Sequence, residues 1–235
     1  MSPQPKAFKP VPKKFHPKGL GIVYEDHDIL VVDKRPGLLT VAYEDQPEEI
    51  SAYELLMRYV CKDNPKSFKR VHMVHRLDRD TSGVMVFAKS EAAREYLIDE
   101  WPNFTKTYQA VVGGYLLVKS GTISSYLAEN AALRMYSVTK PEDGAFASTS
   151  YKVLRESKNR SLLELELHTG KKNQIRVHLS EKGHPVLGDR KYGDKTPGIQ
   201  RLALHSTTLR LNHPHTKEPM VFEAPVPDYF ATLMR

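Results

Sequence analysis

The sequence contains a single cysteine, Cys61, which leaves no basis for an intramolecular disulfide framework or a cysteine-rich zinc site. No apolar run approaches the length that a membrane span needs. The N-terminus carries basic residues but lacks the apolar stretch of a signal peptide. We therefore expect a cytoplasmic protein without membrane contacts.

Several enzyme signatures are absent as well. The chain has no P-loop, no GxSxG turn and no GxGxxG between a strand and a helix. Its 10 histidines do not follow a zinc spacing such as HExxH, so hydrogen-bonded or solvated histidines are expected. The motifs therefore give no support to a nucleotide-dependent or zinc-dependent enzyme.

Positive charge is concentrated at the start of the chain. The 235 residues are 40% hydrophobic and 27% charged, with a net charge of +7, as expected of a soluble globular protein. Residues 1–19 hold 5 Lys, 5 Pro and no acid, and without them 35 − 5 = 30 basic residues face 28 acidic ones. This stretch is predicted to be a flexible tail that either binds a polyanion such as RNA or only aids solubility.

Apolar periodicity and turn signals predict an α+β fold of many short strands and few helices, without internal repeats. Residues 20–235 are expected to form one domain. Two strands are expected within 21–41, around a turn at 26–28. Further strands are expected at 71–74, 84–88, 106–114, 146–156, 161–170, 202–211 and 219–224, and helices at 51–61, 91–101, 171–183 and after Pro227.

The stretch VHRLDRDTSGV (74–84) places alternating charges between two apolar runs. Buried charge is costly unless it is paired or used. A neighbouring guanidinium favours the charged form of a carboxylate, so Asp78, flanked by Arg76 and Arg79, could serve as a nucleophile or general base. The alternative is a charged surface turn with incidental ion pairs.

A second candidate is HTGKKNQIRVHL (168–179), where Lys171, Lys172 and Arg176 crowd a predicted helix start. Cations in a first turn oppose the helix dipole, so an anion is expected to meet them, unless they are simply solvated. Tyr108, in the strand-like KTYQAVV, is either a packing residue or a platform for a base.

Together these stretches resemble the RluA-type pseudouridine synthases, whose common signature is HRLDxxTSG. YEDHDILVVDKRPGLL (24–39) resembles the opening motif of that family, KTYQAVV (106–112) its tyrosine segment, and LHTGKKNQIRVHL (167–179) its third motif. GHPVLGDRKYG (183–193) follows in the expected place. The resemblance extends over roughly residues 21 to 227.

The resemblance implies a pseudouridine synthase fold, with a central, mostly antiparallel mixed sheet flanked by helices and an active site in a cleft. It implies isomerisation of uridine to pseudouridine in rRNA or tRNA, without a metal or organic cofactor. Asp78 would be the catalyst, acting on the base or on the ribose, and Arg176 would pair with it. Tyr108 would stack on the base and serve proton removal from C5. The implied RNA-binding residues are Arg76, which would replace the flipped uridine, Ile175, which would line the pocket, and Gln174, His75 and Arg79.

This sequence departs from the family in two respects. The third motif commonly reads TGRxHQIR, whereas Lys171 and Asn173 stand here in place of Arg and His. Many relatives carry an N-terminal S4-type RNA-binding domain, and the roughly twenty residues before the motifs are too few for one. We therefore expect a single-domain, monomeric member and assign no role to residues 171 and 173.

Two alternatives stand beside the synthase. A non-catalytic RNA-binding protein could retain the fold, but binding alone would not need Asp78, Tyr108 and Arg176. A metal-dependent nuclease could use Asp78, Asp80 and nearby histidines, in which case EDTA would abolish its activity.

Overall fold

The computed structural model describes residues 12, 14, 16–42, 49–193, 198–199 and 201–235. These form two compact units: unit 1 spans 1–104 and 206–225, and unit 2 spans 105–205 and 226–235. Most of the predicted basic tail lies outside the described residues. None of the described helices is both long and apolar enough to cross a membrane.

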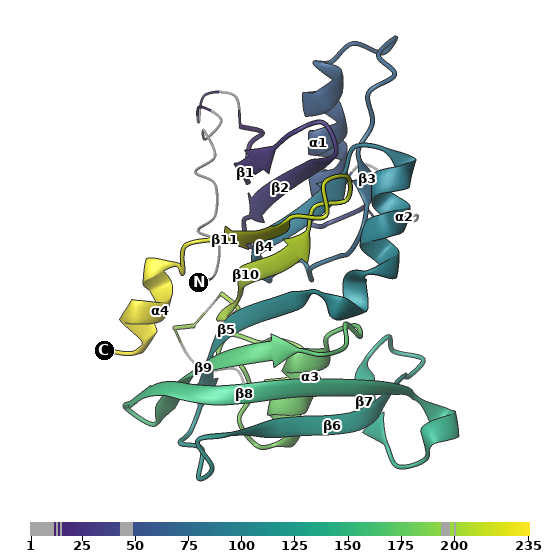
Figure 1. The fold of residues 1–235 in the computed structure, drawn as a ribbon. Coiled ribbons are helices and arrows are strands. Elements are labelled where there is room, and N and C mark those ends of the chain that lie inside the picture. Colours follow the sequence, from purple (N-terminus) through teal and green to yellow (C-terminus); the bar gives the residue numbers. More distant parts are fainter. Residues whose placement is uncertain (1–11, 13, 15, 43–48, 194–197, 200) are drawn as a thin grey trace. The chain divides into compact units, whose positions relative to one another are not determined.

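Unit 1 is a sheet with two helices (Figure 1). Strands β1, β2, β4 and β10 are neighbours in that order, and β3 pairs with β4 while β11 pairs with β10. Helix α2 packs on β3 and β4. The bounds are β1 Leu20–Glu25, β2 Ile29–Lys34, α1 Ala52–Cys61, β3 His72–Met73, β4 Ser82–Ala88, α2 Glu91–Asp99, β10 Leu204–Asn212 and β11 Pro219–Glu223, with a 3-10 turn at Trp101–Asn103.

The apolar run at 84–88 lies in β4. This strand has a neighbour on both sides and every residue in it is buried, so apolar side chains are favoured on both of its faces. The predicted helix at 51–61 is confirmed as α1. The Ser51 side chain accepts the N–H of Glu54, as a capping box requires. The predicted strand 71–74 is too long, because only the half-buried β3 pairs there.

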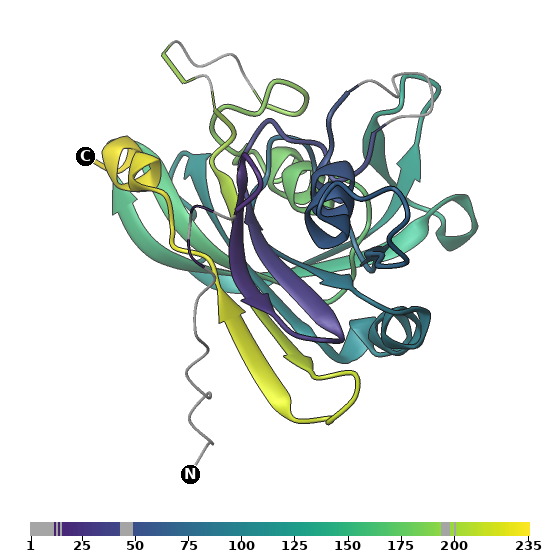
Figure 2. The same cartoon turned by 90° about the horizontal axis from the view of Figure 1, so that it is seen from above.

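Unit 2 has the strand order β5–β9–β8–β6–β7, and α3 packs against β6, β7 and β8 (Figure 2). The four strand pairings of this order are antiparallel. Leu163 and Leu165 of β9 are buried, as their alternation with glutamates predicts. The bounds are β5 Thr105–Gly113, β6 Ser120–Glu129, β7 Met135–Val138, β8 Ala145–Ser157, β9 Arg160–Leu167, α3 Gln174–Glu181 and α4 Asp228–Leu233, with a 3-10 turn at Pro141–Asp143.

Two differences from the sequence-based prediction concern unit 2. Strands β6 and β7 were not predicted, because β6 is largely polar, with only two buried residues, and therefore lacks an apolar pattern. Helix α3 begins at Gln174 rather than at 171, because Asn173 adopts a left-handed backbone conformation with φ 53°. Lys171 and Lys172 therefore precede the helix, and the dipole argument applies only to Arg176.

Candidate active site

Hydrogen bonds within unit 1 hold the backbone of the charged loop that contains Asp78. The Thr40 hydroxyl lies 2.8 Å from the Leu77 carbonyl oxygen and 3.1 Å from the Leu77 nitrogen, so one side chain engages both backbone groups. The Thr81 N–H donates to the Asp78 carbonyl at 3.2 Å and closes a turn. The half-buried Asp78 side chain thus stands on a fixed backbone.

Lys34, at the end of β2, is the second support of this loop. Its side chain is fully buried, and its ammonium donates to the carbonyl oxygens of Leu38 at 2.7 Å, Arg79 at 3.0 Å and Arg35 at 3.1 Å. Burial lowers the pKa of Lys34 to about 7. The negative charges of Asp80, Asp78 and Asp33 act to raise this pKa, but burial outweighs them. Sequence reasoning missed this residue, because a lysine is almost never fully buried.

The glycine of the TSG motif, Gly83, is required by its backbone conformation and by the strand beside it. Its φ is +117°, and an added Cβ would lie 2.1 Å from the backbone oxygen of Ser206 on β10. Only glycine adopts this conformation without a side-chain clash. The motif therefore lets β4 and β10 approach closely directly after the charged loop.

The other predicted residues of unit 1 have different surroundings. Nε2 of His75 accepts the Val86 N–H at 3.1 Å, and its ring stacks on Trp101 with centroids 4.2 Å apart. Arg76 is exposed, and Arg79 forms an ion pair with Glu49. His75 is thus tied into the fold, and the RNA-binding roles of all three stay predictions.

Unit 2 carries the remaining predicted residues. Tyr108 is buried on β5 opposite Leu165, and Ile175 is buried on α3. Gln174 is also buried; its Nε2 donates to the Ser148 carbonyl and the Thr149 hydroxyl, and its Oε1 accepts from Thr169 and from the Lys171 N–H. These bonds fix the start of α3, so the amide orders the segment that presents Arg176.

Arg176 lies in a bidentate ion pair with Asp189. Its Nε is 2.7 Å from Asp189 Oδ2 and its Nη2 is 2.9 Å from Oδ1, with the guanidinium 5.2 Å from the centre of the Tyr192 ring. Burial acts to raise the pKa of Asp189. The hydrogen bonds and charge of Arg176, with the N–H groups of Tyr192 and Lys191, outweigh burial and hold the pKa below its ordinary value. Such a pair fixes the plane of the guanidinium.

Asp189 is a candidate positioning residue that the sequence analysis did not single out, although it lies in the GHPVLGDRKYG stretch. Within unit 2, the cation at the start of α3 meets an anion, the carboxylate of Asp189. The four predicted residues Asp78, Arg76, His75 and Arg79 lie in unit 1, while Tyr108, Gln174, Ile175 and Arg176 lie in unit 2. The pairing of Arg176 with Asp78 stays a prediction.

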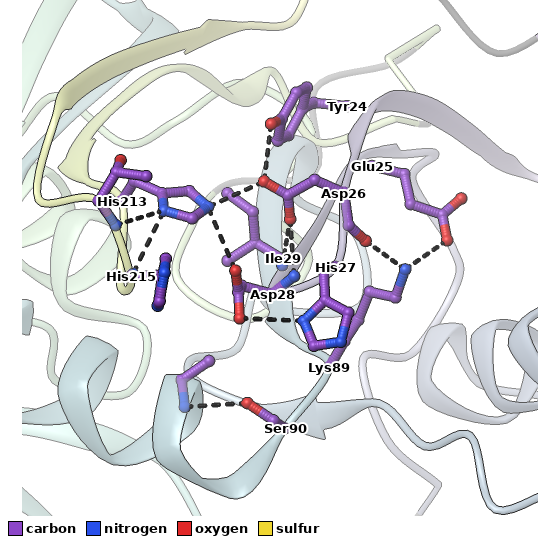
Figure 3. A network of polar contacts seen from close by, with 12 residues as sticks. Tyr24, Glu25, Asp26, His27, Asp28, Ile29, Lys89, Ser90, His213 and His215 are labelled. Carbon is purple, nitrogen blue, oxygen red and sulfur yellow. Dashed lines mark hydrogen bonds and ion pairs between the residues drawn. The ribbon is translucent and has the colours of Figure 1, made fainter.

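Among the described residues, one group has the ligand types and spacing of a metal site: Asp26, Asp28 and His213 (Figure 3). Nδ1 of His213 faces the N–H groups of His215 at 3.2 Å and Thr216 at 3.1 Å, so Nδ1 accepts and Nε2 carries the hydrogen. Nε2 then donates to Asp26 Oδ2 at 2.8 Å. This arrangement is a hydrogen-bonded staple between two turns.

The same hydrogen-bond network shifts the pKa values of two groups, Tyr24 on β1 and Asp26 in the turn that follows it. Burial acts to raise the pKa of Asp26, but hydrogen bonds from Tyr24, the Ile29 and Asp28 N–H groups and His213 outweigh it and lower the pKa. Burial and the bond to Asp26 raise the pKa of Tyr24. The network secures the β1–β2 turn against the β10–β11 turn within unit 1.

A family model described as RNA pseudouridylate synthase matches residues 28–181, which include the charged loop, Tyr108 and Arg176. This stretch is more than half of the chain. The chain belongs to the RNA pseudouridylate synthase family.

Curated relatives and a solved structure agree. The chain is 36% identical over 235 residues to the uncharacterized RNA pseudouridine synthase YlyB of Bacillus subtilis, covering 99% of this chain and 76% of that protein. It is 36% identical over 231 residues to the ribosomal large subunit pseudouridine synthase D of Haemophilus influenzae, covering 92% of this chain and 70% of that protein. The structure of human RNA pseudouridylate synthase domain containing 1 matches with a TM-score of 0.73 and 28% identity, covering 91% of this chain and 86% of that chain.

These matches confirm the predicted family, the α+β pseudouridine synthase fold and the class of enzyme. The departures of this pseudouridylate synthase from the family motif can now be placed. Asn173 caps α3 in a left-handed conformation that asparagine tolerates, and its Oδ1 accepts the Tyr192 hydroxyl at 3.1 Å. Lys171 is exposed, and Lys172 forms an ion pair with Glu129.

The burial of Lys34 in this synthase predicts a pH-dependent stability. Between about pH 7 and the ordinary lysine pKa of 10.5, the unfolded chain holds the Lys34 proton and the folded chain releases it. The contribution of Lys34 to the free energy of unfolding therefore rises with pH in this window, by at most about 1.4 kcal/mol per pH unit.

Urea unfolding of the wild type and Lys34→Met between about pH 6 and about pH 9 measures this effect. The difference, wild type minus variant, should grow as the pH rises above about 7. Exposed Lys152 supplies the control, since the difference between wild type and Lys152→Met should stay flat. A flat or falling difference for Lys34→Met would contradict the assignment.

Proposed function

We propose that this enzyme isomerises specific uridines in structured rRNA or tRNA, with Asp78 as the catalytic carboxylate. The observation that carries the proposal is the loop of residues 75–81. It offers the half-buried Asp78 on a backbone fixed by Thr40 and Lys34, inside the stretch that matches the family. A carboxylate held on a fixed backbone can serve as a nucleophile or a general base.

The reaction rearranges one nucleotide without any change in composition. The bond between N1 of the uracil and C1′ of the ribose breaks, the base turns, and a bond forms between C5 and C1′. C5 loses its proton and N1 gains one, so the isomerisation needs neither an oxidant nor a reductant. Because C5 and C1′ cannot be reached within a stacked helix, the uridine is flipped out of the RNA.

Each predicted residue has a task in this scheme. Asp78 adds to the base or attacks C1′, Tyr108 stacks on the flipped base and serves proton removal from C5, and Arg76 fills the space left in the RNA. Arg176 compensates the charge of Asp78, and Asp189 holds the plane of Arg176. Buried Ile175 supplies an apolar wall of the pocket. None of these steps requires a metal or organic cofactor.

We propose large-subunit rRNA as the first substrate to examine, because the Haemophilus influenzae relative is named for the ribosomal large subunit. tRNA is the second. The enzyme is proposed to act in the cytoplasm, as a monomer.

Mapping of pseudouridines in cells with and without the gene tests this proposal. Carbodiimide adducts on pseudouridine stop reverse transcription, so a site in rRNA or tRNA that depends on the enzyme appears as a lost stop. The stop should return with a plasmid copy of the wild type and stay absent with Asp78→Asn. Identical maps of both RNA classes in the two strains would contradict the proposal.

A further inference from the structure

The loop of residues 62–70, KDNPKSFKR, has an unusual surface. It holds four cations, Lys62, Lys66, Lys69 and Arg70, against one acid. Among them Phe68 is 97% exposed. An aromatic ring held in water among cations buries none of its apolar surface in the folded chain, so folding does not account for it.

This loop is ordered by its own hydrogen bonds. The Lys62 N–H caps α1, the Asn64 side chain accepts the Lys66 N–H at 3.0 Å, and the Ser67 hydroxyl accepts the Lys69 N–H at 3.2 Å. Arg70 Nη1 donates to the Ser67 carbonyl at 2.6 Å. Turns on both sides of Phe68 therefore hold the ring outward, and a partner that binds it pays little conformational entropy.

A groove of about 840 Å³ in unit 1 adjoins the loop. Two of its basic lining residues form ion pairs. Arg58 Nη2 lies 2.6 Å from Glu54 Oε1. Lys89 Nζ lies 2.8 Å from Glu25 Oε1 (Figure 3). In the part of the chain that the structure describes, no carboxylate lies within ion-pair distance of three further lining cations, Lys62, Lys69 and Arg70. The groove therefore keeps a net positive charge beside the exposed ring.

We propose that this loop and groove bind a single-stranded segment of the RNA substrate, with one unpaired base stacked on Phe68. The phosphates of the same segment would meet Lys66 and Lys69 and continue toward Lys62 in the groove. Stacking platforms joined to a basic track are how proteins hold single-stranded nucleic acid without reading its sequence. The inference rests on the proposed function only in taking RNA as the ligand.

Anisotropy of a labelled single-stranded oligouridine, with the full chain carrying Asp78→Ala, measures this binding. Phe68→Leu removes the stacking face and should weaken binding by about 10-fold, whereas Phe68→Trp should bind as well as or better than Phe68. The tryptophan emission of Phe68→Trp should be quenched on binding. Leu117, also 97% exposed but in unit 2, supplies the control, because Leu117→Ala should bind normally.

The charges are tested by the salt dependence of the same binding. Lys66→Gln with Lys69→Gln removes two phosphate contacts and should flatten the slope of log Kd against log salt by about 1.4. The same exchange at exposed Lys152 and Lys182 should leave the slope unchanged. Seven positions are named for substitution in these tests, and the six other than Asp78 are exposed, so unchanged melting temperatures should accompany the results.

Two outcomes separate this inference from the proposed function. If Phe68→Leu binds oligouridine like its parent, or if both double variants alter the slope equally, the inference is overturned, even where the wild type modifies RNA. If Phe68 governs RNA binding while the wild type isomerises no uridine, the proposed function fails and the inference stands. A loop that captures a protein partner but does not affect RNA binding also overturns the inference.

Discussion

Replacing Asp78 by asparagine should lower the release of tritium from C5 of labelled uridine by roughly 1000-fold or more. Asparagine has nearly the shape of aspartate but can neither carry the negative charge nor form the covalent bond that the reaction needs. The backbone of the loop should be unaffected, because Thr40 and Lys34 contact backbone groups of Leu77 and Arg79. The variant should therefore melt and bind RNA like the wild type.

Asp80 provides a control within the same loop. It is exposed, whereas Asp78 is half-buried, so Asp80→Asn should release tritium at close to the wild-type rate. Single-turnover release and RNA anisotropy on both variants separate catalysis from binding. An Asp78→Asn protein with more than about one tenth of the wild-type rate would remove Asp78 from the chemistry.

Replacing Asp189 by alanine should cost both stability and activity. The variant leaves the Arg176 guanidinium, 11% exposed, without the carboxylate that accepts two of its bonds. Breaking a buried pair from one side costs roughly 3–5 kcal/mol. Because the guanidinium loses the bidentate pair that fixes its plane, tritium release should fall by about 100-fold as well.

Asp189→Asn tests the same contact if the alanine variant fails to fold. Its amide can still accept one Arg176 bond and the N–H groups of Lys191 and Tyr192. Asp189 has a folded pKa below its ordinary 3.8, so its stabilisation is present above about pH 4 and is lost as the pH falls through the folded pKa. The stabilities of wild type and Asp189→Asn should therefore converge in acid.

Exposed Asp143 of unit 2 is the matched control, since Asp143→Asn should alter neither stability nor rate. Activity and urea unfolding are measured together on all three variants. A full wild-type rate for Asp189→Ala at unchanged stability would show that Arg176 needs no partner in unit 2.

The sequence alone predicted the elements whose pattern is local. Strand β4 follows from an apolar run, α1 from the apolar periodicity of 51–61, and β10 and β11 from two further apolar stretches. Each signal lies within a few residues of the element it predicts. The charged loop was found for the same reason, because its charges contrast with their immediate neighbours.

The contacts that hold the site were harder to predict. Asp189 stands 13 residues from Arg176 in a loop, and a lone aspartate there carries no sign of its partner. Lys34 has the side chain of a surface residue, yet the fold buries it under carbonyl oxygens contributed in part by a loop 45 residues away. Such long-range pairings follow from the tertiary fold, and propensity does not encode them.

Tritium release by the wild type is the most direct measurement of the central claim. The substrates are rRNA and tRNA labelled at C5 of uridine and purified from cells that lack this enzyme, with EDTA present throughout. The account predicts release from at least one of the two RNA pools, since the chemistry needs only side chains of the protein. Intact RNA binding without release from either pool would contradict it, and release or cleavage that EDTA abolishes would point to a metal-dependent enzyme instead.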